Sequence, residues 1–249
     1  MARPGQPVGG RPLPTALLRV AAGADLHCDA SPQSLRALSD AARAARTADL
    51  VLLAGDLTAN GLPAEARAIA DLFADFEPPV VAVLGNHDLR GGGGEVEAVL
   101  GGAGIRVLRS EQARLRIADA EVGIVGTTGC RGGFHGRPVP GLSRPERRVQ
   151  RELVASETAA LEDGLRAVAG CAPRIVLMHY SPTADTLQGE PRKLLPLLGC
   201  DRLAGPIAAH EPDLVVHGHA HHGTLRGQIG RTPVFNVSVA GFHELELAA

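Results

Sequence analysis

Five short segments of the chain gather residues that commonly bind metal ions, and each segment follows an apolar run. They hold Asp25 and His27 in ADLHCD, Asp56 in AGDLTANG, Asn86, His87 and Asp88 in GNHD, His179 in MHYSP, and His219 and His221 in HGHAHHG. Ligands collect at the carboxyl ends of strands in open α/β sheets. If each apolar run is a buried strand, the five segments meet in one crevice.

The residue types indicate a pair of borderline divalent ions rather than an all-oxygen calcium or magnesium cage. Imidazole suits zinc, iron, manganese or nickel, and a carboxylate such as Asp56 can bridge two such ions. Asp25 and His27 could both turn toward one ion if the backbone bends between them. His219 and His221 are also two residues apart, but they could each serve a different ion.

The same blocks hold one neutral donor and two surplus histidines. Asn86 offers a carbonyl oxygen, which leaves charge on a metal ion to polarise phosphate. The run HGHAHH contains four histidines, which is more than a pair of ligands requires. We therefore expect His217 and His222 to be supporting residues or spectators rather than ligands.

In this order, the blocks DLH, GDLTANG, GNHD, MH and GHAH resemble those of the calcineurin-like metallophosphoesterase superfamily. The resemblance covers about Leu17 to Val239. It implies an α/β fold of four layers, in which two mixed β-sheets pack together between outer helices. It also implies a first metal held by Asp25, His27, Asp56 and His221, and a second held by Asp56, Asn86, His179 and His219.

The resemblance further implies a hydrolase of phosphomonoesters or phosphodiesters with two divalent ions, manganese, iron or zinc. Such ions, about 3.5–4 Å apart, activate a shared water, bind phosphoryl oxygens and neutralise charge in an in-line displacement. A hydroxide that bridges the ions is the implied nucleophile. His87 is then the histidine beside the phosphate that assists the leaving oxygen, and we predict that Asp88 orients it.

Two departures separate this sequence from the protein phosphatases of the superfamily. Those enzymes carry an Asp-Arg pair where this chain has Ala59 and Asn60, and their third block ends in Glu rather than Asp88. The bacterial phosphodiesterase and phosphomonoesterase branch is the better match. A non-catalytic scaffold that binds a protein partner and a nuclease of the same superfamily remain alternatives, although all five metal blocks are intact.

Composition narrows the partners and the compartment. The 249 residues are 45% hydrophobic and carry a formal net charge of −2, and the basic residues are scattered. We therefore expect a small phosphorylated substrate and no obligate nucleic acid. No apolar run is long enough to cross a membrane. The four cysteines form no CxxC pair, which favours buried thiols in a reducing, cytoplasmic location; a protein partner stays undefined.

Apolar runs alternate with helix-start signals, and this order predicts an α/β fold with mixed sheets. A tail is expected at 1–14 and a single domain at 15–249. Strands are predicted at 16–24, 49–54, 79–84, 105–108, 114–117, 122–126, 174–178, 214–216 and 234–237. Helices are predicted at 32–48, 63–76, 95–100, 145–169 and 201–209.

One long turn-rich segment, 127–141, has the composition of a functional loop, and we interpret it as a lid over the site. Within it, Arg131 and Arg137 could clamp a phosphate, and Phe134 could stack on a base. Tyr180, the one tyrosine of the chain, follows His179 and could line the pocket. These four residues are the predicted substrate contacts.

Overall fold

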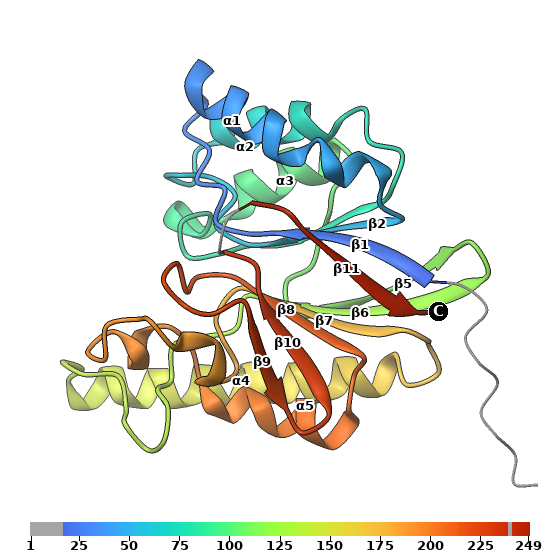
Figure 1. Cartoon of the computed structure of the whole chain (residues 1–249). Coiled ribbons are helices and arrows are strands. Elements are labelled where there is room, and N and C mark those ends of the chain that lie inside the picture. Colours follow the sequence, from blue (N-terminus) through green and yellow to red (C-terminus); the bar gives the residue numbers. More distant parts are fainter. Residues whose placement is uncertain (1–16, 239–240) are drawn as a thin grey trace, which may run out of the picture.

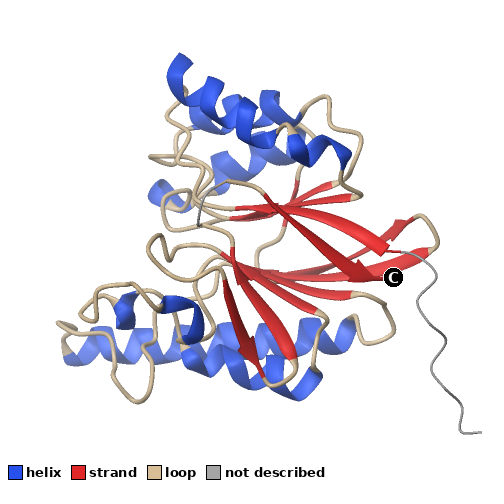
Figure 2. Ribbon diagram, viewed as in Figure 1, coloured by secondary structure: helices blue, strands red, loops and turns tan. Residues whose placement is uncertain are grey.

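The computed structural model describes residues 17–238 and 241–249, so the tail predicted at 1–14 lies outside the described residues. Two β-sheets pack face to face, and helices cover the outer face of each sheet (Figures 1 and 2). This four-layer arrangement of two mixed sheets between helices confirms the predicted fold class.

The first sheet has five strands in the order β11-β1-β2-β3-β4. Its four parallel strands are β1 (Leu17–Gly23), β2 (Leu50–Ala54), β3 (Val80–Val83) and β4 (Arg106–Val107). The register pairs Val20 with Leu50 and Val51 with Val80. β11 (His243–Ala248) runs antiparallel to β1 along the edge, and the sequence analysis did not predict this strand.

The second sheet has six strands in the order β5-β6-β7-β8-β10-β9. They are β5 (Glu111–Ile117), β6 (Ala120–Thr127), β7 (Arg174–Met178), β8 (Leu214–His217), β9 (Arg226–Ile229) and β10 (Thr232–Asn236). The central four strands are parallel, whereas β5 and β9 pair antiparallel at the two edges. Both sheets are therefore mixed, as predicted.

Local signals explain where the helices begin. Ser31 caps α1 by accepting a hydrogen bond from the Ser34 amide at 3.2 Å, and Ser143 and Glu146 form a capping box at the start of α4. The helices are α1 (Pro32–Ala42), α2 (Pro63–Phe73), α3 (Gly94–Gly102), α4 (Arg144–Ala167) and α5 (Ala204–His210). Short 3₁₀ helices lie at Ala44–Thr47, Arg90–Gly92, Asp185–Leu187, Leu195–Leu197 and Asp201–Leu203.

Burial alternates along the central strands in the way a four-layer fold requires. In β2, Leu50 and Leu52 pack between the two sheets, whereas Val51 and Leu53 pack against the helices of the first sheet. Every residue of β2 is consequently buried, which explains why its sequence is a continuous apolar run. A third cluster joins the second sheet to α4 and α5, through Val176 among others.

Two further sequence expectations concern the whole chain. All four cysteines are buried and free, as small apolar residues would be. Across the ranges that the structure describes, none of the helices combines the length and the apolar character that a membrane span needs.

Candidate metal centre

The predicted metal-binding residues follow five strands whose carboxyl ends meet at one edge of the two sheets. Asp25 and His27 follow β1, Asp56 follows β2, Asn86 and His87 follow β3, His179 follows β7, and His219 and His221 follow β8. These strands are parallel neighbours within their own sheets. The parallel order therefore brings together residues that lie up to 196 positions apart, as between Asp25 and His221.

The backbone is left-handed at four of these residues. The φ angles are 53° at Asp25, 41° at His27, 51° at Asp56 and 69° at His219. Non-glycine residues adopt this region at a cost and cluster there at functional sites. The bend at Asp25 and His27 is what lets two residues of one strand end turn the same way, as the sequence analysis required.

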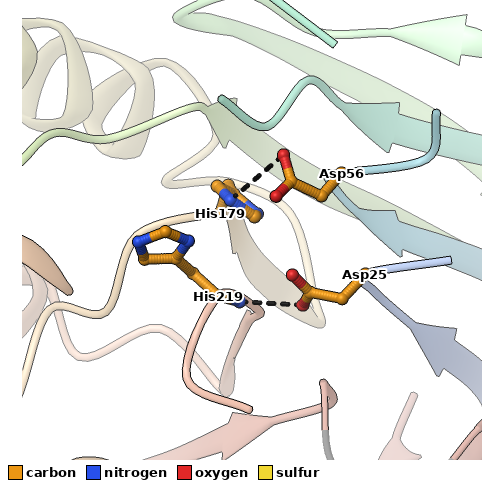
Figure 3. Close-up of side chains that lie close together, drawn as sticks. All are labelled: Asp25, Asp56, His179 and His219. Atoms are coloured by element: carbon orange, nitrogen blue, oxygen red, sulfur yellow. Dashed lines mark hydrogen bonds and ion pairs between the residues drawn. The ribbon is translucent and has the colours of Figure 1, made fainter. Parts of the chain in front are cut away.

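Asp25, Asp56, His179 and His219 form the buried part of the cluster, with one ligand atom from each within 4.8 Å of the others. Figure 3 shows these four side chains turned toward one another from both sheets. The His179 Nε2 atom lies 3.5 Å from Asp56 Oδ1, and the main-chain amide of His219 donates to Asp25 Oδ2 at 2.8 Å. Asp25 and Asp56 are thus fixed before any ion binds.

A second group consists of Asp25, His27 and His221. The Nε2 atom of His221 lies 3.0 Å from Asp25 Oδ1, and that of His27 lies 3.8 Å from the same oxygen. His27 Nε2 is also 4.0 Å from Asp56 Oδ2. The two carboxylates therefore stand between two sets of imidazoles.

Asn86 and His87 complete the cluster from the end of β3. The Asn86 side-chain oxygen lies 3.2 Å from His179 Nε2, so it faces the buried group. His87 Nε2 lies 4.0 Å from Asp56 Oδ2, and its ring stands edge-on to that of His27 with centroids 4.5 Å apart. His87 thus forms a third group of possible ligand atoms with His27 and Asp56, and it is partly open to solvent.

Asp88 makes contacts that differ from those expected. Its buried carboxylate accepts hydrogen bonds from the main-chain amides of Leu57, Thr58 and Gly85 and from the Thr58 hydroxyl, at 2.6–3.1 Å. The His87 ring is held instead through Nδ1, 2.7 Å from the Ala59 carbonyl oxygen. Asp88 therefore ties together the loops after β2 and β3 rather than orienting the His87 ring.

The two carboxylates are held as anions by the imidazoles around them. Burial alone would raise the pKa of Asp25, but its hydrogen bond with His221 and the charge of His179 keep that pKa below its usual value. Burial would also raise the pKa of Asp56. The hydrogen bond with His179 and the charge of His179 outweigh that effect, so the Asp56 pKa lies below its usual value. Burial lowers the pKa of His219 to about 3, with His179 adding to the effect, so its ring is a neutral donor.

His217 and His222 lie apart from these donor groups. His217 is fully buried, with Nδ1 2.8 Å from the Gly218 carbonyl oxygen and Nε2 2.8 Å from the Thr186 hydroxyl. Both ring nitrogens are satisfied when the imidazole is neutral, which is the state of a supporting residue. His222 is exposed, and its main-chain amide donates to Glu190.

One of the four predicted substrate contacts, Tyr180, lies beside the cluster. The Tyr180 ring is centred 4.5 Å from that of His219 and 5.4 Å from that of His179, and burial raises the Tyr180 pKa to about 12. Arg131 is exposed and close enough to oppose this rise through its charge. Tyr180 thus forms one border of the site, and contact of Arg131 with substrate stays a prediction.

The other two predicted contacts are a buried phenylalanine and an arginine that lines a cavity. Phe134 is only 4% exposed and packs with Leu187, Leu198 and Ala220, so its ring is not available to stack on a base. Arg137 lines a separate cavity. The burial of Phe134 argues against stacking on a base, although its neighbour Ala220 lies between His219 and His221. Contact of Arg137 with substrate stays a prediction.

The 127–141 segment does not form the free lid that its composition suggested. Thr127 is the last residue of β6. The amides of Gly132 and Gly133 both donate to the Gly199 carbonyl oxygen, at 2.9 and 3.0 Å. These hydrogen bonds hold the middle of the segment against the loop that contains Gly199.

Arg90 is a site residue that the sequence analysis missed. Its Nη2 atom lies 3.3 Å from His87 Nε2, and its Nη1 donates to the Ala59 carbonyl oxygen at 3.2 Å. The arginine follows GNHD by two positions, which gives it i to i+3 spacing from His87 in a helical turn. This spacing was the sequence signal that could have placed Arg90 next to His87.

The comparisons with known proteins agree with this geometry. Residues 18–223 match the family model of calcineurin-like phosphoesterases, and the chain belongs to this family. A probable cyclic nucleotide phosphodiesterase from Synechococcus sp. is 38% identical over 80 residues, which are 28% of this chain and 31% of that relative. The chain thus spans about a third of the length of that curated relative.

Solved structures show the same fold. The phosphopantetheinyl hydrolase from Mycobacterium tuberculosis superposes with a TM-score of 0.67 at 14% identity, over 91% of this chain and 95% of that one. A putative 5′-nucleotidase from Staphylococcus aureus gives a TM-score of 0.62 at 16% identity, over 93% of this chain and 51% of that one.

Proposed function

We propose that this protein hydrolyses phosphate esters with two divalent metal ions held by the cluster. Asp25, His27, Asp56 and His221 would hold the first ion, and Asp56, Asn86, His179 and His219 the second. The donor set of imidazoles, carboxylates and one amide oxygen suits manganese, iron or zinc. The chemistry supplied by such ions would be binding of phosphoryl oxygens and activation of water.

The observation that carries this proposal is the convergence of the donors. Ligand atoms of Asp25, Asp56, His179 and His219 lie within 4.8 Å of one another, and so do those of Asp25, His27 and His221. Asp56, the proposed shared ligand, belongs to the first group and also to a third group with His27 and His87. Asp25 belongs to the first two groups. The left-handed backbone at four of these residues is costly, and a metal-binding role accounts for it.

The remaining residues of the site would handle the phosphate and the proton. The contact between His87 Nδ1 and the Ala59 carbonyl oxygen requires that Nδ1 carries a hydrogen. The reactive nitrogen is therefore Nε2, which faces Asp56. When the ring carries a second proton, on Nε2, His87 can donate that proton to the leaving oxygen and return to the neutral form with hydrogen on Nδ1. Arg90, adjacent to Nε2, can bind a phosphoryl oxygen and hold it toward His87.

The substrate class follows from the family and the exposed border of the site. Arg131 and Tyr180 would contact the part of the substrate beyond the reacting phosphate. The name of the Synechococcus relative makes a cyclic nucleotide a reasonable first diester to test beside a monoester.

Metal content and turnover measured on one protein preparation test the proposal. Plasma mass spectrometry should find about two divalent ions per chain. The same protein with added manganese should cleave bis-p-nitrophenyl phosphate, p-nitrophenyl phosphate or cyclic AMP. A chain that binds no metal and turns over none of the three after reconstitution contradicts the proposal.

Two other outcomes would favour the alternatives. An occupied two-metal site without turnover, together with a stable partner in a pull-down, would indicate a scaffold. Salt-sensitive DNA binding with strand cleavage would indicate a nuclease.

A further inference from the structure

A cavity of about 340 Å³ lies between the segment after β6, the first half of α4 and the short helix Asp201–Leu203. The segment and the start of α4 are the yellow-green part of the ribbon beside the second sheet in Figure 1. None of the residues that line this cavity is a proposed metal ligand. It is therefore a site separate from the metal centre.

Four arginines from three elements line the cavity, against one acidic residue, Asp201. Arg137 comes from the segment after β6, Arg147 and Arg151 from α4, and Arg202 from the short helix. Within residues 17–238 and 241–249, none of the four has a carboxylate oxygen within 4.0 Å, although Arg147 donates to the Leu142 carbonyl oxygen. The cavity thus has a surplus of positive charge.

The other arginines of α4 provide a contrast on the same helix. Arg148 donates to Glu152 at 2.8 Å, and Arg166 pairs with Glu162 and Asp163 at 2.7 and 3.0 Å. Arg148 and Arg166, which do not line the cavity, are thus paired with carboxylates, whereas Arg144 has no ion pair among the described residues. Arg147 and Arg151, one helical turn apart, carry like charges that repel each other, and among the described residues neither forms an ion pair with a carboxylate.

Apolar side chains form the rest of the wall. Val139 and Val154 are 5% and 6% exposed, and Pro138 and Leu142 lie beside them. The cavity therefore offers guanidinium groups and an apolar surface together. Guanidinium forks match phosphate oxygens, whereas the apolar wall favours a ligand that carries more than a bare anion.

We propose that this cavity binds a phosphorylated small molecule with an apolar part, such as a nucleoside phosphate. The ligand's phosphate would lie among Arg137, Arg147, Arg151 and Arg202. Its apolar part would lie against Val139, Leu142 and Val154. This site does not depend on the metal centre, so it can be tested with metal-free protein.

Isothermal titration of the metal-free full chain with ADP tests the inference. The variant R147Q/R151Q removes two cavity charges, and the control variant R148Q/R166Q removes two charges of the same helix that do not line the cavity. The first should weaken ADP binding at least about tenfold, because charge-assisted hydrogen bonds are lost. The control should bind as the unmodified chain does.

Further measurements keep the inference testable if R147Q/R151Q does not fold. R202Q changes a cavity arginine outside α4 and should also weaken ADP binding. Inorganic pyrophosphate should bind more weakly than ADP because it lacks an apolar part. Absence of ADP binding, equal losses in the two double variants, unchanged binding in R202Q, or equal affinity for ADP and pyrophosphate would each overturn the proposal.

Discussion

The Nδ1 atom of His87 lies 2.7 Å from the carbonyl oxygen of Ala59, so the loop after β2 sets the orientation of a ring from the loop after β3. Only the main chain of Ala59 makes this contact. Position 59 therefore still orients His87 in this chain, although its side chain is only a methyl group. Asp88 joins the same two loops through four hydrogen bonds.

Replacement of His87 by alanine should lower turnover roughly 10²–10⁴-fold, because it removes the proposed proton donor. Metal content should not change, since His87 is not among the proposed ligands. Turnover and plasma mass spectrometry on the same sample measure both. The matched control is His222→Ala, an exposed histidine near the site, which should keep its turnover. Loss of metal together with turnover in His87→Ala would make His87 a ligand.

The Asp56→Asn variant should lose affinity for both metal ions together. Asp56 lies within 4.0 Å of His27 and within 3.5 Å of His179, which belong to the two proposed sites. An amide cannot supply the negative charge that a carboxylate shared by two ions provides. Metal titration followed by plasma mass spectrometry would resolve the two sites. Loss of one ion alone would show that Asp56 serves a single site.

The Gly85→Ala substitution should disrupt the proposed metal centre without replacing any of the proposed ligands. A Cβ atom at Gly85 would lie 2.2 Å from Asp56 Oδ1 and 2.3 Å from the Asp56 nitrogen, so the carboxylate would have to move. We expect metal affinity to fall at least about tenfold, given that ligand geometry decides affinity. Gly101→Ala is the control, because its Cβ would meet nothing within 4 Å. Equal metal binding by both variants would contradict this packing argument.

Metal-free protein should lose stability in mild acid partly through His217. Burial lowers the pKa of His217 to about 4 from an ordinary value of 6.5. The unfolded chain therefore binds a proton between these values that the folded chain does not, and the free energy of unfolding falls as pH falls. From pH 7 to about pH 4.5 this contribution amounts to roughly 2–3 kcal/mol.

The variant His217→Gln should lack this part of the pH dependence. Urea unfolding of both metal-free proteins at the two pH values gives the comparison, and the remaining carboxylates and histidines contribute to both. An equally steep loss of stability in the variant would mean that His217 is not the residue that takes up the proton.

The strand pattern could be predicted because both faces of each central strand are covered. Leu50–Ala54 is apolar throughout, and β7 begins and ends at the predicted residues. β11 was missed because its sequence, HELELA, alternates charged and apolar residues and lies at an edge. Its place beside β1 depends on long-range pairing such as that between Val20 and Leu245.

The predicted ends of the helices differ more from the structure than the predicted ends of the central strands do. The helix predicted to reach residue 48 ends at Ala42 and continues as a 3₁₀ turn, and the one predicted at 201–209 is divided between a 3₁₀ turn and α5. Local hydrogen bonds decide such ends, and apolar periodicity does not record them.

By itself, the sequence determined the family, the order of the central strands along the chain and the choice of the proposed ligands, because residue type and local spacing carry that information. The tertiary structure decided which side chains meet. Asp88 contacts backbone amides, Arg90 adjoins His87, Phe134 is buried, and Arg137 joins three distant arginines around a second cavity. Such neighbours depend on loop paths and on packing between elements far apart in the sequence, where spacing along the chain no longer indicates distance in space.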